Sequence, residues 1–531
     1  MIKYTPANQL TLEGFEHPFD QELSIDNRWV KLASLIPWDK LASVYAKQLC
    51  SDSGRESIDI RMVIGAIIVK HKLGLDDRGT VAMISENIYL QYFCGLKSFQ
   101  TADPFHPTVF VDIRKRMGAS EFDLWNTLII EKADSLQPKR RQLISKKKDD
   151  SSDQDKNPNS TPKPPAHKGK LKIDASVANQ KIVFPTDAKL LHTCREESER
   201  LIDILYSQTN LTQKPRTYRR VARSEYLSFS KKKKKSKKQI RKFIGKQLNY
   251  LKRNLNHITF LLDQVELLQS QIENSLGVKS AFPNKFPCSK RDQKIYWVIQ
   301  HIYAQQKYMY EQKTHQHSDR IVNIYQPYVR PIPRGKDKAA TEFGAKISAS
   351  EIAGMSRVEH ISWDNFNESK DLELQVKLFK QTYGHYPELV LADRIYLNRN
   401  NRKFLKEKGI RTVGKPLGRP PKEELSPYQK RKLKKERNQR NLIEGKFGQA
   451  KNAYGLNNIQ AKRSDTSQSW IGAIFFIMNL VSLEKIAKKP AIFWLKIKHS
   501  IKLHVIKPLY QHNLKAVMWL FDLQNQNLRI I

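Results

Sequence analysis

The chain has 531 residues and is strongly basic, with 94 Lys and Arg against 53 Asp and Glu and a net charge of +41. Such an excess is typical of proteins that bind nucleic-acid phosphates, although ribosomal and architectural proteins can be equally basic. The four cysteines, at positions 50, 94, 194 and 288, are too far apart for a zinc knuckle or a C-x-x-C redox site, so we interpret them as reduced thiols.

Residues 1–135 are predicted to form a helical DNA-binding or dimerisation domain. Apolar residues recur at helical spacing over 58–73, and a second helix is predicted over 80–93. A third helix carries three consecutive basic residues, Arg114, Lys115 and Arg116. Short helices followed by a basic helix could form a helix-turn-helix module on DNA; the alternative is a packing domain whose basic residues are only solvated. No secretory leader opens the chain, so we expect a cytoplasmic, nucleoid-associated protein.

The next segment, 136–170, is rich in Lys, Asp, Ser, Asn and Pro, and its composition predicts a disordered linker. Residues 188–315 are then predicted to be a basic helical insertion. Seven lysines between 231 and 238 indicate either a solvated segment or a phosphate contact. Apolar residues at heptad spacing over 244–265 predict a coiled-coil seam, whose partner is either the helix near 190–205 of the same chain or a second subunit.

Two aspartates lie in predicted strands. Asp174 is in a segment, 171–177, whose apolar residues alternate as in a half-buried strand, so it would project from the opposite face. Asp393 ends the apolar run 389–392, which is typical of a buried parallel strand, and ligands bind at the carboxyl ends of such strands. Either residue alone could be a turn or capping residue. The rival acids in this region are Asp187, Asp364 and Glu368.

A strand pair is predicted over 342–348 and 356–363, followed by alternating helices and strands up to residue 413. This order predicts an α/β core. The basic loop 414–427 follows and would position phosphates rather than read a sequence. The apolar stretch 470–481 is too short to span a bilayer, so we interpret it as a core helix and expect no membrane contact.

Glu444 lies in a helix predicted to begin near residue 427. On a regular helix, Arg437, Arg440, Glu444 and Lys451 fall within an arc of roughly 60°, with Lys446 nearby. One helix face would therefore carry an acid among cations, which suits a phosphodiester and a metal ion. The alternative is that the arginines are structural partners of Glu444.

Several motifs together resemble the DDE transposases of bacterial insertion sequences, in the branch with an all-helical amino-terminal domain. The resemblance covers residues 1–485. It rests on NRWV at 27–30, IPWD at 36–39, KIDAS at 172–176, PTD at 185–187, FGAK at 343–346, YP at 386–387, LADRIY at 391–396, GKPLGRPP at 414–421 and RNLIEGK at 440–446.

The resemblance implies a ribonuclease-H-like α/β catalytic core over 171–485, with residues 486–531 as a tail of unassigned role. It implies that Asp174, Asp393 and Glu444 are the catalytic triad and bind Mg²⁺ or Mn²⁺, two ions in all. The family signature Tyr-x2-Arg-x3-Glu-x6-Lys is matched at Arg440, Glu444 and Lys451, but Arg437 stands in the place of the Tyr.

The expected function is a transposase that acts as a homodimer on double-stranded DNA. It would bind the terminal inverted repeats of its element, cut them with Mg²⁺ and join the ends to target DNA. Two alternatives remain open: a metal-dependent DNA nuclease of the same fold, and a catalytically inactive basic DNA-binding protein.

Overall fold

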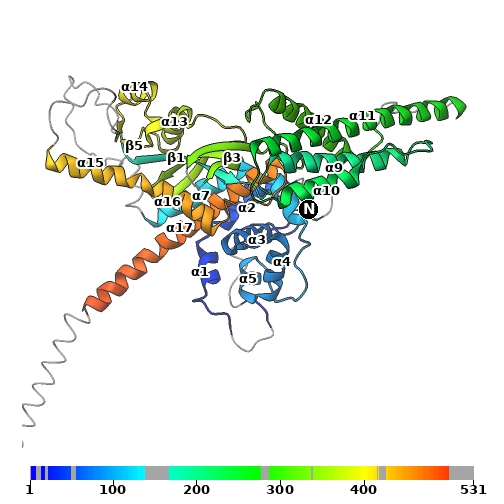
Figure 1. Cartoon of the computed structure of the whole chain (residues 1–531). Coiled ribbons are helices and arrows are strands. Elements are labelled where there is room, and N and C mark those ends of the chain that lie inside the picture. Colours follow the sequence, from blue (N-terminus) through cyan, green and yellow to red (C-terminus); the bar gives the residue numbers. More distant parts are fainter. Residues whose placement is uncertain are drawn as a thin grey trace, which may run out of the picture.

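The computed structural model describes residues 2–6, 14–17, 22–49, 56–137, 167–276, 286–336, 339–414, 417 and 426–501. A helical amino-terminal region, a mixed sheet with helices on both faces and a helical insertion make up this part of the chain (Figure 1). Most of the predicted linker, most of the basic loop and the tail beyond residue 501 lie outside the described residues.

The amino-terminal region contains α1 (Arg28–Leu35), α2 (Trp38–Ala46), α3 (Ile60–Leu73), α4 (Asp77–Glu86), α5 (Ile88–Phe93), α6 (Val109–Arg116) and α7 (Ala119–Leu136). The first predicted helix is confirmed as α3, which ends at Gly74 with a φ of 69°, a conformation that favours glycine. The helix predicted over 80–93 is two helices. Asn87 has an extended backbone and its side chain accepts a hydrogen bond from the N–H of Leu90, so it ends α4 and caps α5.

The long helix α17 (Ser464–Ile501) joins the amino-terminal region to the rest of the molecule. On one side Phe476 packs against Phe122 and Trp125 of α7, and on the other Phe475 packs against Phe447. The apolar stretch predicted to be a core helix is therefore a core helix, shared by two hydrophobic cores. Residues 464–488 are long and apolar enough to cross a membrane, but 72% of their most apolar stretch is buried inside the protein.

The sheet is built around β1 (Lys170–Asn179). On one side β1 pairs antiparallel with β3 (Ala339–Ile352), which pairs in turn with β2 (Arg330–Lys336) and β4 (Met355–Ser362). On the other side β1 pairs parallel with β5 (Leu389–Leu391), and β5 pairs parallel with β6 (Arg411–Thr412). The predicted strand pair is confirmed as β3 and β4.

Gly344 explains the close approach of β1 and β3. It is paired with Asn179, and a Cβ at position 344 would lie 1.9 Å from the carbonyl oxygen of Ala178. Because that neighbour is backbone, it cannot move aside as a side chain would. The glycine of the FGAK motif is thus required by the packing of the sheet.

Helices cover both faces of the sheet (Figure 1). Ile173 of β1 packs with Leu372 and Val376 of α13 (Asp371–Tyr383), on the face near α14 (Arg399–Glu407). On the opposite face Ala178 of β1 packs with Ile443 of α16 (Asn441–Ala453), which follows α15 (Pro427–Gln439). The alternation of apolar and polar residues in β1 predicted that only one face of this strand is buried. In the structure α16 and α17 cover the second face as well.

The insertion contains α9 (Asp187–Tyr206), α10 (Arg219–Lys231), α11 (Lys237–Leu276) and α12 (Lys290–Glu311). The heptad residues Leu248, Leu251 and Ile258 are buried in one cluster with leucines of α9 and isoleucines of α12. The seam is therefore covered within the chain, as the intramolecular alternative predicted.

Candidate active site

Asp174 lies in the middle of β1, on the sheet face that α16 covers. In the pairing of β1 with β3, Asp174 lies opposite Ala349. Ala349 packs in the same hydrophobic core as Ala178 and Ile443. One carboxylate oxygen accepts a hydrogen bond from the N–H of Ala175 at 2.9 Å. The Asp174 side chain is half-buried.

Asp393 is brought to the same face by the parallel register of β1 and β5. The last residue pair between the two strands is Lys172 of β1 with Leu391 of β5. Asp174 lies two residues after Lys172, and Asp393 lies two residues after Leu391. Because side chains two residues apart in a strand share a face, both acids project on the side of α15 and α16. Asp393 has an extended backbone, is exposed, and accepts a hydrogen bond from the N–H of Arg394 at 2.7 Å, capping the short helix η3 (Arg394–Tyr396).

Glu444 lies in the first turn of α16, where a carboxylate is favoured by the helix dipole. The predicted single helix is interrupted at Arg440, whose N–H bonds to the carbonyl oxygen of Arg437. Arg437 is therefore on α15, whereas Glu444 and Lys451 are on α16. The Arg440 guanidinium nevertheless contacts the Glu444 carboxylate at 2.7 Å.

Arg440 connects the three acids. It pairs with Glu444, and it lines a cavity of about 330 Å³ together with Asp393 and Arg437. Burial raises the pKa of Asp174 to about 6, the positive charge of Arg440 lowers it, and the negative charges of Glu368 and Glu444 raise it. Arg440 thus contacts Glu444, lines a cavity with Asp393 and acts on Asp174 through its charge, although the three acids lie on three different elements.

Glu368 is the rival acid that the structure places near Asp174. It begins the short helix η2 (Glu368–Lys370), is largely buried, and lies 3.6 Å from the ammonium of Lys346. Asp364 is 73% exposed beside Arg330, and Asp187 accepts hydrogen bonds from Gln306 and Arg320 in the insertion. Neither Asp364 nor Asp187 shares the surroundings of Asp174.

The donor set suits a hard cation, because carboxylate oxygens are the ligands that Mg²⁺ and Mn²⁺ prefer. Among the residues that the structure describes, however, no three Asp, Glu, His or Cys side chains lie close enough to hold one ion together. Glu444 is instead paired with Arg440. Metal binding by the three acids stays a prediction.

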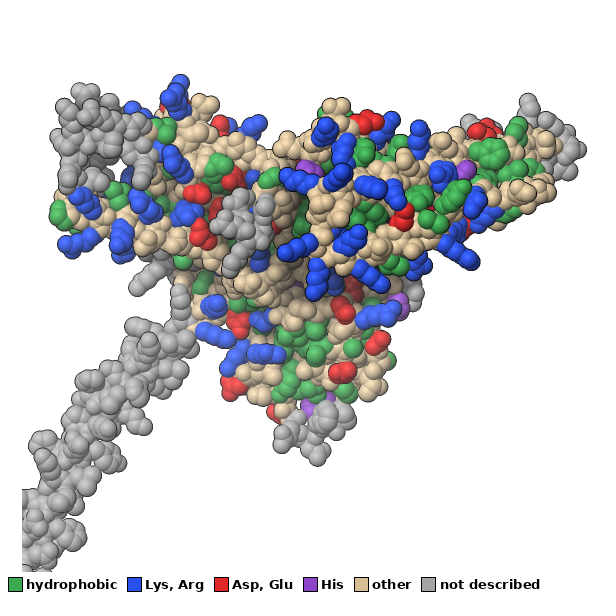
Figure 2. Space-filling model, viewed as in Figure 1, with side chains coloured by type: hydrophobic (Ala, Val, Ile, Leu, Met, Phe, Trp, Pro, Cys, Tyr) green, Lys and Arg blue, Asp and Glu red, His purple; other side chains and the backbone are tan. Residues whose placement is uncertain are grey.

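The basic residues predicted on the Glu444 helix have different surroundings. Arg437 is exposed on α15, where lysines and arginines cover the surface in the left part of Figure 2. Lys446 donates a hydrogen bond to the hydroxyl of Ser482 at 3.0 Å, and its burial lowers its pKa. Lys451 contacts Glu342 of β3 at 3.2 Å. Of these three, Arg437 is the one with an open path to a phosphate.

The basic residues predicted on the amino-terminal helix also differ. Arg114 forms two hydrogen bonds with Asp77 of α4, at 2.9 and 2.7 Å, and its guanidinium lies over the ring of Trp470. Lys115 and Arg116 are exposed, and Lys115 contacts Asp112 at 3.0 Å. Arg114 thus joins three helices, a role that the sequence did not reveal because Asp77 and Trp470 are distant along the chain.

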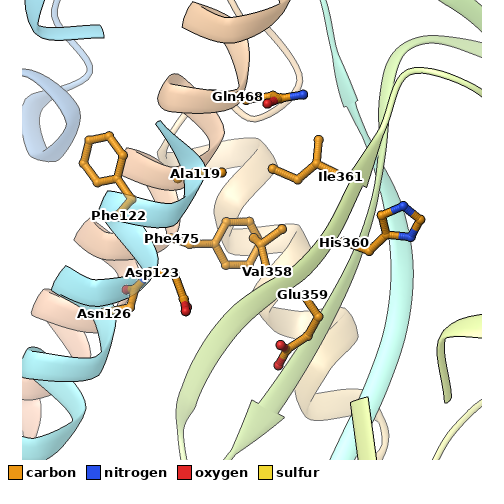
Figure 3. A pocket seen from close by; sticks show the side chains of 11 residues that line it. Ala119, Phe122, Asp123, Asn126, Val358, Glu359, His360, Ile361, Gln468 and Phe475 are labelled. Carbon is orange, nitrogen blue, oxygen red and sulfur yellow. The ribbon is translucent and has the colours of Figure 1, made fainter. Parts of the chain in front are cut away.

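A second polar cavity, of about 200 Å³, lies between α7, β4 and α17. Figure 3 shows Asp123 and Asn126 on α7 facing Val358 and Glu359 on β4. Asp123 accepts two hydrogen bonds from Arg357, and burial raises the pKa of Glu359, which accepts a hydrogen bond from the Ser350 hydroxyl. Both acids of this cavity thus accept hydrogen bonds from neighbouring side chains. The cavity lies where the helical amino-terminal region meets the sheet.

Comparisons with known proteins place two segments of the chain in described families. Residues 390–481 match the model described as a transposase DDE domain, and residues 17–116 match the model described as a transposase domain, DUF772. The first segment contains Asp393 and Glu444. An uncharacterized protein, ORF8 in the nfe locus of Rhizobium meliloti, is 33% identical over 89 residues, which make up 17% of this chain and 42% of that protein. The match thus spans less than half of that relative, and no solved structure matches the chain.

Proposed function

The two transposase segments confirm the resemblance to DDE transposases of insertion sequences, and we propose that this chain cuts and joins DNA at the ends of its own element. It binds the terminal inverted repeats and hydrolyses a phosphodiester at each end. The freed 3′-hydroxyl then attacks a phosphodiester of target DNA, so that its oxygen bonds to the phosphorus and the target's own 3′ oxygen leaves. The observation that carries the proposal is the position of Arg440, which pairs with Glu444, shares a cavity with Asp393 and partly offsets the burial that raises the pKa of Asp174.

The strand arrangement supports a ribonuclease-H-like core over residues 171–485. The first strand, β1, is central, β2, β3 and β4 form the antiparallel part of the sheet on one side, and the parallel strands β5 and β6 lie on the other. The proposed domains are a helical DNA-binding or dimerisation domain over 1–135, a linker over 136–170 and the core with its insertion over 188–315. Residues of α17 pack in the core of the first domain and in the core of the third domain.

In the proposed reaction the three acids would hold two divalent ions, and such ions would supply activation of the attacking oxygen and stabilisation of the leaving oxygen. Asp174 supplies the half-buried inner ligand, and Asp393 and Glu444 supply exposed ligands at the rim. Glu444 would have to leave the guanidinium of Arg440 before it could hold an ion. The released guanidinium can then bind a non-bridging phosphate oxygen, which places the scissile group between the acids and the α15–α16 junction.

DNA contacts are proposed for the exposed Arg437, for Arg440 once it leaves Glu444, and for Lys115 and Arg116 of α6. Contacts by Arg114, Lys446 and Lys451 require each residue to give up the protein partner that it has in this structure. Lys115 and Arg116 also have partners, Asp112 and Tyr45, but both side chains are exposed. Two element ends must be brought together for joining, which favours a homodimer.

The test is an assay of Mg²⁺-dependent cleavage and strand transfer on DNA that carries the element ends. The wild type is compared with Asp174→Asn, Asp393→Asn and Glu444→Gln, and with the exposed acid variant Asp364→Asn as the matched control. Loss of both activities in the three variants, with binding retained and the control active, supports the proposal. Cleavage without joined products would favour the nuclease, and binding without cleavage by the wild type would favour the inactive DNA-binding protein.

A further inference from the structure

Residues 214–253, here called the basic arm, hold an extreme local concentration of positive charge. They contain 17 Lys and Arg and a single acid, Glu225, so 40 residues carry a charge of +16 out of +41 for the whole chain. The arm consists of the loop before α10, α10 itself, the connection 232–236 and the first part of α11. The acid cluster around Arg440 lies on other elements, so the arm is a separate feature.

Most of this charge is not neutralised within the protein. Asp203 pairs with Lys214 and Arg219, and Glu225 pairs with Lys246. Within the part of the chain that the structure describes, the seven lysines between 231 and 238 form no ion pair, and six of them are fully exposed. Lysine and arginine side chains crowd the surface of α10 and α11 in Figure 2. Self-repulsion of this kind is relieved when an anionic partner binds.

The lysine run is held in place at both ends. Phe229 at the end of α10 stacks on Phe243 of α11, with ring centroids 4.0 Å apart. The ammonium of Lys235 lies 5.3 Å from the Phe229 ring and donates a hydrogen bond to the carbonyl oxygen of Lys232. Tyr226 stacks on His192 of α9 at 3.5 Å. The run is therefore a short connection between two packed helices, which presents its charges on a fixed surface.

The start of the arm has an unusual conformation. Tyr218 has a φ of 53°, which side chains other than glycine rarely adopt. Its ring lies between the guanidinium groups of Arg216 and Arg253, at 4.5 and 4.6 Å. A cavity of about 430 Å³ is lined by residues 214–221, four of which are Lys or Arg. This geometry binds α10 to α11 and adds Arg216, Arg220 and Arg253 to the charged surface.

We propose that the basic arm binds the phosphate backbone of double-stranded DNA, outside the segment that is cut and without reading its sequence. The proposal rests on the proposed function. The aromatic rings of the arm contact one another, the ring of His192 or a guanidinium group, which leaves no row of free rings on which unpaired bases could stack. The dense cations of the arm instead suit a duplex, which carries one negative charge per about 1.7 Å of its axis.

The arm therefore adds length to the DNA that the protein holds. At 1.5 Å per residue, residues 237–253 alone extend over roughly 25 Å, which corresponds to about seven base pairs. Each lysine that contacts a phosphate contributes about 0.9 to the slope of log affinity against log salt. Removal of three such contacts should reduce this slope by up to about 3 for any duplex sequence.

The test compares two triple variants of the full chain that lose the same charge. The arm variant is Lys232→Gln with Lys233→Gln and Lys234→Gln. The control variant is Lys290→Gln with Lys294→Gln and Lys307→Gln, at exposed positions on α12. Binding to duplexes with and without the element ends is measured in chelator over about 0.05 to 0.2 M salt, where phosphate contacts dominate affinity. Thermal unfolding and the corresponding Lys→Arg triple variant of the arm show whether the arm variant is folded and whether charge alone restores binding.

We expect the arm variant to bind both duplexes at least tenfold more weakly at low salt, with a shallower salt slope, and the control and Lys→Arg variants to bind as the wild type does. Equal effects in the arm and control variants, no effect in either, a loss confined to duplexes with the element ends, or a stronger effect on single-stranded DNA would overturn the proposal. Because binding is measured without metal, these outcomes do not depend on cleavage. If the arm variant binds DNA normally and the wild type cuts DNA, the proposal for the basic arm is refuted and the proposed function is not.

Discussion

The half-buried position of Asp174 makes a specific prediction about stability. Replacement by Asn should make the metal-free protein more stable at neutral pH while it abolishes cleavage. The Asn side chain has the same shape and retains the oxygen that accepts the hydrogen bond from the N–H of Ala175. What it removes is a negative charge in a site where burial and the neighbouring acids disfavour that charge.

The magnitude follows from the pKa of Asp174, which burial raises from an ordinary value of 3.8 to about 6. A difference of about two units, at 1.36 kcal/mol each, corresponds to roughly 3 kcal/mol at most. Because the pKa is higher in the folded protein than in the unfolded chain, the folded state favours the protonated acid. This contribution to stability is present below pH about 4 and is lost as the pH rises through about 6.

At pH 7.5 the wild type therefore carries the full cost of the ionised acid and Asp174→Asn carries none. We expect the variant to be more stable by about 1 to 3 kcal/mol at pH 7.5, and the difference to vanish near pH 4. The measurement is urea unfolding in the presence of a chelator at several pH values, with Asp364→Asn as an exposed control that changes stability by less than about 0.5 kcal/mol. Mg²⁺ should then stabilise the wild type more than Asp174→Asn.

Two results would refute this reasoning. If Asp174→Asn is no more stable than the wild type at pH 7.5, burial does not disfavour the charge of Asp174. If the variant is equally stabilised at pH 4 and pH 7.5, the gain does not come from ionisation. Either result would also weaken the interpretation of Asp174 as an inner metal ligand.

Three further substitutions test other contacts. Arg114→Ala should lower the free energy of unfolding by about 2 kcal/mol, because Asp77 loses a half-buried partner; unchanged urea unfolding would contradict the pair. Gly344→Ala should lower it by at least about 3 kcal/mol, because the new Cβ would overlap the Ala178 carbonyl; an unaltered thermal midpoint would show that β1 and β3 can separate at no cost. Arg437→Ala should leave unfolding unchanged and reduce the salt slope of DNA binding by about 1, and an unaltered slope would remove Arg437 from the DNA contacts.

Local patterns of sequence predicted many of the elements. Gly74 ends α3, and the heptad spacing over 244–265 predicted the seam that α9 and α12 cover. Errors occurred where one residue ends a helix and also begins the next. The helix over 80–93 is divided at Asn87, and the helix that carries Glu444 is divided at Arg440. Asn87 caps α5 with its own side chain, which apolar spacing does not report.

The sequence by itself determined which acids are candidates and the kind of element that carries each one. Alternation gave a strand around Asp174, an apolar run gave a strand before Asp393, and helical spacing gave a helix for Glu444. These are local properties, because the burial of a side chain within one turn or strand leaves a period in the sequence.

Only the tertiary structure decided which of these residues meet. The parallel register of β1 and β5 puts Asp174 and Asp393 on one face, and the packing of α16 on that face brings Glu444 and Arg440 to them. The structure also placed Glu368 near Asp174. A period in the sequence shows that a face is covered but not by which element, since the partner depends on contacts between segments that are distant along the chain.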